Sequence, residues 1–340
     1  RAVPCPRNLA GAPGRLPGMH RILVTGAGSW VGGRLVQRLE RLEDTTVFPV
    51  DVVEPRLRFR SEFYRTSLDQ LPFASYLLDV RPHTVVHHQV LDRSADVGSV
   101  RSHEQVVVGA QALFGAIRRC HTVRHVIVKS GSDVYDSSSR SPSVFPESTK
   151  AKGRRYRYQR DLLDVEAFVD EMAGIRQDLD FTVLRFASIL GPNIDNTLSR
   201  FIRLPVVPTL LGRDPRLQFI YEEDAVGALA HCVGHPVSGV FNIAGAGQLY
   251  LSRVLRLGLR PSQPLPRTAF RAAVRGLNRL DLVVLPHIVS LLKHGRVMET
   301  ELMREELGFV PRLNCRQTVL ATYRRLPGAA LPKEFSSAYE

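Results

Sequence analysis

The sequence predicts an α/β protein in which a doubly wound parallel sheet is joined to a smaller, mixed domain. Two observations support this prediction. Residues 21–40 contain, in succession, a short apolar run, glycines at positions 26, 28 and 32, and an apolar stripe at helical spacing. Apolar strands then alternate with amphipathic helices through the first half of the chain, the pattern of a Rossmann sheet with right-handed crossovers.

The glycine segment has the composition of a dinucleotide-binding loop. The run Ile22-Leu23-Val24 is short enough for a buried strand, and Val31, Leu35 and Leu39 recur on one helix face. Glycines let the backbone approach a pyrophosphate, which binds the free N–H groups and the positive dipole end of the helix. We therefore expect cofactor contacts from the loop residues Gly26, Gly28, Ser29, Trp30, Val31 and Gly32.

Asp51 makes this interpretation more specific. It ends the next apolar run, Thr46-Val-Phe-Pro-Val50. A carboxylate at this position can accept both hydroxyls of an adenosine ribose, and it would repel a 2′-phosphate. The expected cofactor is therefore NAD rather than NADP. An ordinary strand–turn–helix is the alternative.

The same patterns give the expected elements and boundaries. The predicted strands are 21–25, 46–52, 83–87, 124–129 and 181–186, and the predicted helices are 31–42, 69–80, 102–119 and 156–176. After Gly191-Pro192 the pattern becomes irregular. We expect a disordered leader over 1–18, a dinucleotide-binding domain over 19–186, a substrate-binding region with segments returning to the sheet over 187–325, and a tail over 326–340.

Composition is that of a globular protein. Of 340 residues, 44% are hydrophobic and 23% are charged, enough for a sizeable core. The longest apolar candidate, 282–292, is interrupted by Pro286 and His287, so no membrane span is expected, and 1–18 lack the apolar core of a signal peptide. Four scattered cysteines without a Cys-x-x-Cys pair argue against a disulfide framework and a zinc site and favour the cytoplasm.

The chain is strongly basic. Its formal net charge is +13, and only five of its 46 basic residues are lysines. A surface that attracts phosphates, acidic lipids or nucleic acid is one interpretation. We favour solvated arginine-rich helix faces, because the arginines are spread along the chain and no aromatic-rich RNA motif accompanies them. No specific nucleic-acid partner is expected, and the one dense basic cluster is 150–160.

An ordered series of motifs covers about residues 20–325. It consists of the glycine loop with Asp51, Thr84-Val-Val-His87, Ser130-Gly-Ser-Asp-Val-Tyr-Asp136, Tyr156-Arg-Tyr-Gln-Arg160, Leu184-Arg-Phe-Ala-Ser-Ile-Leu-Gly-Pro192, Phe219-Ile-Tyr-Glu-Glu-Asp224, Phe241-Asn-Ile-Ala-Gly245 and 297–308. The series resembles that of the extended short-chain dehydrogenase/reductases, in the NAD-dependent epimerase/dehydratase family. The subgroup that it resembles most comprises actinobacterial proteins that are UDP-glucose 4-epimerase-like.

The resemblance implies a reaction and its residues. A tyrosinate takes a proton from a substrate hydroxyl while hydride moves to nicotinamide, a lysine four residues on supports it, and a serine bonds the reacting oxygen. Tyr156 would be the base, Arg160 stands at the lysine position, and Ser130 or Ser132 would assist, since Gly131 takes the serine position. The resemblance also implies cofactor contacts from His87 and Gln89 and substrate contacts from Ser188, Arg216 and Asn242.

Three functions remain open from the sequence. The first is a nucleotide-sugar epimerase or dehydratase that acts through a keto intermediate, with a degenerate triad and a small-molecule substrate such as a UDP-sugar. The second is a non-catalytic binding or regulatory protein of the same fold, favoured by Gly131 and Arg160. The third is a hydroxysteroid or carbonyl reductase. No metal is expected, because the adjacent His87 and His88 would face opposite sides of a strand.

A homodimer is expected from the predicted helices at 102–119 and 156–176. Their apolar residues form a broader band than one core face requires, and in the family such helices pair across a two-fold axis. The band consists of Val106, Val107, Ala110, Leu113, Ala116, Ile117, Leu162, Val165, Phe168 and Val169.

Overall fold

The computed structural model describes residues 19–88, 104–139, 141–149, 156–279 and 284–323. A seven-stranded sheet, parallel at every pairing, forms its centre in the order β11-β6-β5-β4-β1-β2-β3. Its strands are β1 (His20–Thr25), β2 (Thr45–Asp51), β3 (Tyr64–Arg65), β4 (Thr84–His87), β5 (His125–Gly131), β6 (Asp180–Phe186) and β11 (Gly239–Ile243). The predicted doubly wound α/β fold is thus confirmed, and β11 is a segment from the second half that returns to the sheet.

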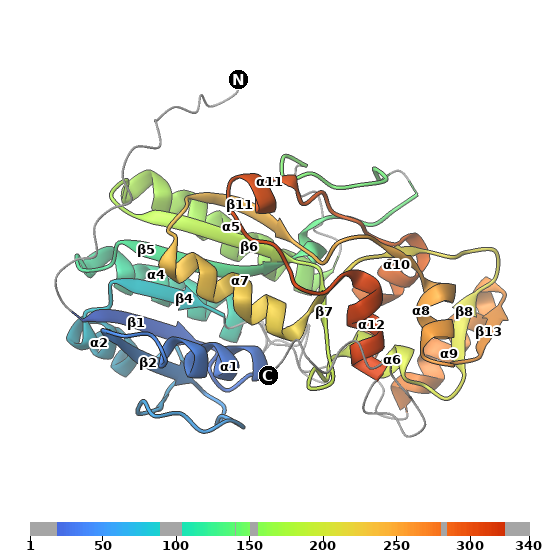
Figure 1. Cartoon of the computed structure of the whole chain (residues 1–340), viewed down its shortest axis with the longest axis horizontal. Helices are drawn as coiled ribbons and strands as arrows, with labels where there is room; N and C mark the ends of the chain where they lie inside the picture. The colour runs from blue at the N-terminus through green and yellow to red at the C-terminus, as the bar shows by residue number, and fades with distance from the viewer. Residues whose placement is uncertain (1–18, 89–103, 140, 150–155, 280–283, 324–340) are drawn as a thin grey trace.

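Helices cover both faces of this sheet (Figure 1). One face packs against α1 (Trp30–Leu39) and α7 (Glu222–Gly234), and the other against α2 (Leu71–Val80), α4 (Gly109–Arg119) and α5 (Arg157–Ile175). Successive residues of β5 supply the two cores in turn: Ile127 packs toward α1 and α7, whereas Val126 and Val128 pack toward α4 and α5. The predicted helix at 102–119 begins, in its described part, with a π-helical turn at Glu104–Val108.

The smaller lobe is mixed, as the irregular pattern after Gly191 predicted. It lies to the right of the sheet in Figure 1 and has its own core, which includes Phe201, Phe219 and Phe270. Its strand pairs are β7 (Ser188–Leu190) with β10 (Phe219–Tyr221), β8 (Val207–Leu210) with β13 (Ser262–Leu265), and β9 (Arg216–Leu217) with β12 (Leu249–Tyr250). Its helices are α6 (Thr197–Ile202), α8 (Leu251–Leu257), α9 (Arg267–Arg279), α10 (Pro286–His294) and α12 (Cys315–Tyr323), and the short α11 (Glu301–Glu305) packs near β11.

Three consecutive acidic residues at the start of α7 join the lobe to the sheet. Glu222 accepts hydrogen bonds from the backbone N–H and the side chain of Asn193, and Glu223 pairs with Arg34 of α1 at 2.8 Å. Asp224 accepts the backbone N–H groups of residues 312 and 313, both at 3.0 Å. Negative charge is favoured at a helix N-terminus, so the turn that anchors these segments is also a stable place for the carboxylates.

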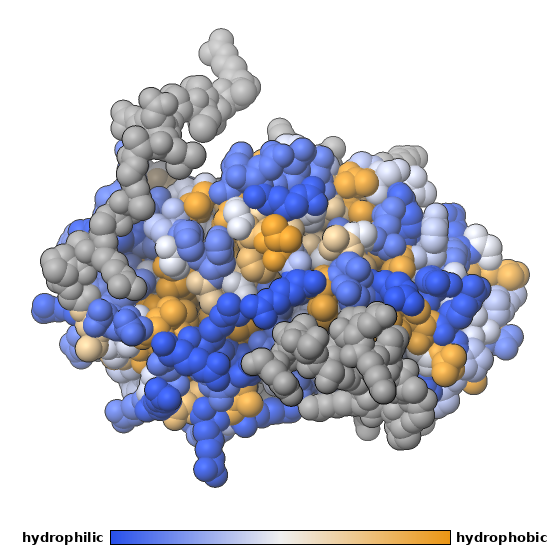
Figure 2. All heavy atoms as spheres, in the orientation of Figure 1, coloured by the Kyte–Doolittle hydropathy of each residue, from blue (hydrophilic) through white to orange (hydrophobic). Residues whose placement is uncertain are grey.

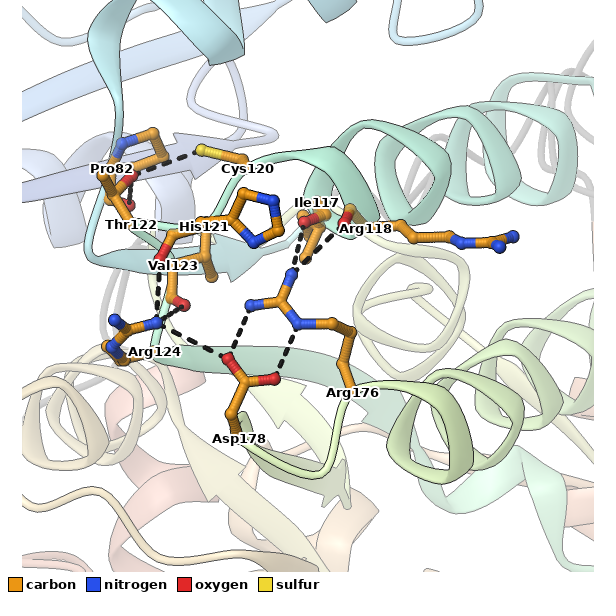
Figure 3. A network of polar contacts seen from close by, with 10 residues as sticks. All are labelled: Pro82, Ile117, Arg118, Cys120, His121, Thr122, Val123, Arg124, Arg176 and Asp178. Carbon is orange, nitrogen blue, oxygen red and sulfur yellow. Dashed lines mark hydrogen bonds and ion pairs between the residues drawn. The ribbon is translucent and has the colours of Figure 1, made fainter.

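A polar network lies at the amino end of the sheet, where β5 and β6 begin (Figure 3). The Arg176 guanidinium pairs with Asp178 at 2.7 Å and also donates to the last carbonyl groups of α4, those of Ile117 and Arg118. The Ile117 carbonyl also accepts the N–H of Cys120, the residue after the helix, at 3.0 Å, and a cation at this end interacts favourably with the helix dipole. The network therefore ties the end of α4 to the end of α5.

The apolar band of α4 and α5 is used inside the chain. The structure buries nine of its ten residues and packs Phe168 against the same core. The prediction that this band leaves apolar residues over for a two-fold contact is therefore wrong. The π-turn, α4 and α5 pack against one another as well as against the sheet, so the chain itself covers the band. The homodimer remains a prediction that rests on the family resemblance.

On the face seen in Figure 2, hydrophilic side chains predominate over α11, and apolar groups lie beside them. None of the helices in the described ranges is long and apolar enough to cross a bilayer. Cys120, Cys232 and Cys315 are free and buried, and burial raises the pKa of Cys232 to about 12.

A histidine at the amino end of β5 gives a pH test of the fold. Burial lowers the pKa of His125 to about 4, and its Nε2 lies 2.8 Å from the Thr182 hydroxyl. Between pH 6.5 and 4 the unfolded chain binds a proton here that the folded chain does not, so stability falls by about 1.4 kcal/mol per pH unit as the pH is lowered. His125→Gln should remove this contribution in denaturant titrations at pH 7, 6 and 5.

The exposed His121 provides the control for that experiment. His121→Gln makes the same substitution at an exposed position and is measured in the same titrations. Equal slopes for His125→Gln and the unmodified protein would contradict the lowered pKa of His125 in the folded state.

Candidate functional site

The glycine loop between β1 and α1 is built so that side chains cannot enter it. Gly26 has a φ of 75°, in the left-handed region that favours glycine. A Cβ at Gly32 would lie 2.1 Å from the Gly26 carbonyl oxygen, and one at Gly28 would lie 2.3 Å from that of Val53. The loop therefore needs glycine at 26, 28 and 32, as the sequence pattern predicted.

Asp51 determines the shape of this loop. One carboxylate oxygen accepts the N–H of Gly28 at 2.9 Å, and the other accepts those of Val52 and Val53 at 2.7 and 3.2 Å. These bonds hold a buried carboxylate at the carboxyl end of β2. Each carboxylate oxygen can accept more than one hydrogen bond, so the oxygen that binds Gly28 is also able to accept from a ligand hydroxyl.

The start of α1 fits an anion. Ser29 caps the helix: its hydroxyl accepts the Gly32 N–H at 3.0 Å and donates to the Gly26 carbonyl at 2.9 Å. No hydrogen bond between described residues takes the N–H groups of Trp30 and Val31, and the first turn carries no acidic residue. Two donors at a positive dipole end, above glycines that exclude a Cβ, form a cradle for a pyrophosphate.

Two buried histidines follow at the end of β4. The Nδ1 of His87 lies 2.9 Å from the Thr25 hydroxyl, and that of His88 lies 3.3 Å from the Ser29 hydroxyl. Burial lowers the pKa of His87 to about 4 and, together with the charge of Lys129, holds the pKa of His88 well below its usual range. Both rings are therefore neutral at pH 7. Gln89, the other predicted contact here, lies outside the described residues.

A pocket opens at the same edge of the sheet, where the ends of β5 and β6 meet the smaller lobe. Its walls combine apolar side chains with hydroxyl, amide, imidazole and ammonium groups, a composition that suits a small polar ligand. The lining consists of Lys129, Ser130, Gly131, Asp133, Tyr158, Phe186, Ala187, Ser188, Ile189, Asn196, Thr197, Leu198, Leu285, His287 and Ile288.

The predicted serines are already engaged in the structure. Ser130 donates to Glu166 at 2.5 Å, and Glu166 forms a buried ion pair with Arg185 at 2.6 Å. Ser132 accepts a hydrogen bond from Arg296, which also pairs with Asp133 at 2.9 Å. Burial opposes the charge of Asp133, but Arg296 keeps the pKa of this carboxyl below its usual value. Of the two serines, Ser130 is the one that lines the pocket.

The structure brings Tyr158, rather than Tyr156, to the pocket. Tyr156 is the residue before α5, and Arg160 is exposed on that helix. Tyr158 lines the pocket and stacks on His287 with ring centroids 4.8 Å apart. Counting four residues from Tyr158 gives Leu162, whose side chain would lie 3.6 Å from a Cβ at Gly131. An apolar contact thus stands where the family pattern puts serine and lysine.

The three predicted substrate residues lie in different places. Ser188 lines the pocket. Asn242 is fully buried: its side chain accepts from the Tyr135 hydroxyl at 2.8 Å and donates to the Phe145 carbonyl at 3.0 Å. Arg216 donates to the Ser143 carbonyl and lines a second hollow, with Arg296 and His294. The structure therefore does not bring Arg216 or Asn242 to the pocket.

No three His, Cys, Asp or Glu side chains within the described residues gather as metal ligands would. The polar groups at the carboxyl edge instead suit binding of a phosphate-containing ligand beside a small pocket with a phenol. Sequence patterns missed Tyr158, His287 and Lys129; the position of Lys129 directly after the apolar run 126–128 was the available signal.

Comparison with known proteins places the chain in a family. The model of the NAD dependent epimerase/dehydratase family matches residues 22–244. The chain belongs to this family. An uncharacterised protein of Mycobacterium tuberculosis is 36% identical over 301 residues, which cover 86% of this chain and 80% of the relative.

Solved structures with the family's fold are more distant in sequence. A UDP-glucose 4-epimerase of Thermotoga maritima, solved with UDP-glucose, has a TM-score of 0.71 at 18% identity and covers 89% of this chain and 97% of its own. MoeE5, solved with UDP-glucuronic acid and NAD, has a TM-score of 0.70 at 22% identity, and the match covers 89% of this chain and 98% of MoeE5. These similarities establish the fold.

The glycine loop gives a stability test. Gly28→Ala forces the Val53 carbonyl away and disturbs the bond to Asp51, so it should cost about 1–3 kcal/mol of unfolding free energy. Gly115 lies exposed on α4, and a Cβ added there would have nothing within 4 Å, so Gly115→Ala should stabilise the protein by about 0.5–1 kcal/mol. Denaturant titrations compare the two, and equal effects would contradict the loop geometry.

Proposed function

We propose that the protein is an NAD-dependent enzyme that acts on a nucleotide-linked sugar through a keto intermediate. The observation that carries the proposal is the meeting, at one edge of the sheet, of a dinucleotide-type loop and a pocket containing Tyr158. Ligands of open parallel sheets bind at this edge. Family membership and neighbours solved with NAD and UDP-sugars support the same assignment.

Different residues along this edge of the sheet would bind different parts of the cofactor and the substrate. Asp51 on β2 would accept the hydroxyls of the adenosine ribose, and the N–H groups of Trp30 and Val31 would hold the pyrophosphate. Bound NAD would accept and return a hydride. Tyr158, as its phenolate, would take the proton of the substrate hydroxyl while the hydride leaves, and the resulting phenol would return the proton when the hydride is returned; Ser188 and Asn196 line the same pocket and would orient the sugar.

A second function has its own supporting observation. The contact between Gly131 and Leu162 removes a hydroxyl and an ammonium from the pocket wall, and Arg160 points to solvent. A binding protein without catalysis would keep the loop and lose these groups. Binding of NAD without turnover of any nucleotide-linked sugar would favour this second function.

Cofactor choice is the first test. Calorimetric titration should show NAD binding at least about tenfold tighter than NADP, a difference of about 1.4 kcal/mol, since the Asp51 carboxylate would repel a 2′-phosphate. Titrations with AMP and 2′,5′-ADP make the same comparison of affinities with ligands that contain only the adenosine end of each cofactor. Tighter binding of NADP would contradict the role of Asp51.

The second test asks which tyrosine acts as the base. Tyr158→Phe should lower turnover of UDP-glucose or UDP-galactose by about 10²–10⁴-fold, with NAD binding nearly unchanged, because the phenol proton is lost and the ring is kept. Tyr156→Phe is the matched variant, two residues away and outside the pocket lining. A large loss in Tyr156→Phe with none in Tyr158→Phe would return the role of base to Tyr156.

A further inference from the structure

Lys129 is a buried ammonium that no protein group neutralises in the described part of the chain. Its side chain is 6% exposed, and it lines the pocket from near the carboxyl end of β5. No ion pair or hydrogen bond between described residues includes its Nζ. Burying an unpaired cation costs several kcal/mol of folding free energy. Unpaired buried charges of this kind cluster at functional sites, where a ligand can pair with them.

The strand register puts His88 beside it. β4 and β5 pair in parallel up to His87 and Val128, so the next residues along the two strands are His88 and Lys129. His88 lies two residues after Val86, and Lys129 lies two residues after Ile127. Val86 and Ile127 face α1 and α7, and side chains alternate between the two faces of a strand, so His88 and Lys129 point to that same side. The electrostatic effect of Lys129, which lowers the pKa of His88, agrees with this proximity.

The hydrogen-bond pattern fixes which nitrogen of His88 carries the proton. The single hydrogen of the Ser29 hydroxyl is donated to the Gly26 carbonyl, so the Nδ1 of the neutral His88 must donate to Ser29. Its Nε2 is then a bare acceptor. Among the described residues this buried atom has no partner, and the residue is 2% exposed. A donor is missing at His88, and an acceptor is missing at Lys129.

One hydroxyl group satisfies both, because it donates one hydrogen bond and accepts others. Resting on the proposed binding of NAD, we propose that Lys129 and His88 together bind a hydroxyl of the ribose beside the nicotinamide. In this arrangement an ammonium on β5 does the work that the family pattern assigns to a lysine on α5. The helix position is the apolar Leu162, which packs against Gly131.

The position along the edge selects this ribose over the adenosine one. The strand order from Asp51 to Lys129 is β2, β1, β4, β5. Three strand spacings of about 4.8 Å separate the two by about 14 Å, so one ribose cannot reach both. Asp51 stands at the adenosine end, whereas Lys129 shares a pocket with Tyr158, where the reacting end must lie.

The test compares ligands that differ by this ribose. ADP ends at the pyrophosphate, whereas ADP-ribose carries a second ribose, and both can be titrated by calorimetry without any turnover. The unmodified protein should bind ADP-ribose and NAD more tightly than ADP. Lys129→Met should weaken ADP-ribose and NAD binding by about 10- to 100-fold, the size of a hydrogen bond to a charged group, and leave ADP binding unchanged.

Two further variants make the result specific. Arg213→Met removes an exposed cation and should change none of the affinities. His88→Phe should also weaken ADP-ribose but not ADP, and the double variant with Lys129→Met should lose less than the sum, because one hydroxyl serves both groups. Lys129→Met should also unfold at a higher temperature than the unmodified protein, since it removes an unpaired buried charge.

The outcomes separate the two proposals. If the unmodified protein binds NAD and Lys129→Met binds ADP-ribose equally well, the role of Lys129 is wrong and the proposed cofactor stands. If the unmodified protein binds none of ADP, ADP-ribose and NAD, both are wrong. An equal loss of ADP and ADP-ribose binding in Lys129→Met would show general damage to the site and would also overturn the proposal.

Discussion

The buried ion pair between Arg185 and Glu166 is the contact on which the carboxyl edge of the sheet depends. It joins the end of β6 to the middle of α5, with both side chains almost removed from solvent. Arg185 also donates to Tyr135, which in turn donates to Asn242 on β11. One guanidinium thus ties β6, β11 and α5 together, and loss of either partner of such a pair typically costs about 3–5 kcal/mol.

This pair also sets which groups are available for chemistry. Glu166 takes the hydroxyl hydrogen of Ser130, so the serine nearest the pocket is committed to the network. The pair also joins β6 to α5, the helix that carries Tyr158 in the pocket lining, Leu162 against Gly131 and Arg160 on its exposed side. The chain has the loop and Asp51 of the family pattern, whereas its pocket wall has Gly131 and Leu162 in contact and the buried Lys129 on β5.

The glycine loop and the five strands of the first half were predictable, because a buried parallel strand and a loop without Cβ atoms leave few alternative residues. The choice between Tyr156 and Tyr158 was not. Tyr156 has extended backbone just before α5, whereas Tyr158 lies in the first turn of the helix, and the local pattern does not show which of the two rings reaches the pocket. The local pattern likewise does not show that Arg216 and Asn242 lie outside the pocket lining, since their hydrogen-bond partners lie more than 70 residues away in sequence.

The most direct measurement is identification of the nucleotide that the purified full-length protein carries. The protein is denatured, and the released small molecules are quantified by chromatography and mass spectrometry before and after incubation with a mixture of NAD and NADP. We predict NAD or NADH, at up to one molecule per chain, with NADP at trace amounts. Protein that holds no dinucleotide after incubation, or that holds NADP in preference, would contradict the dinucleotide site and with it the proposed chemistry.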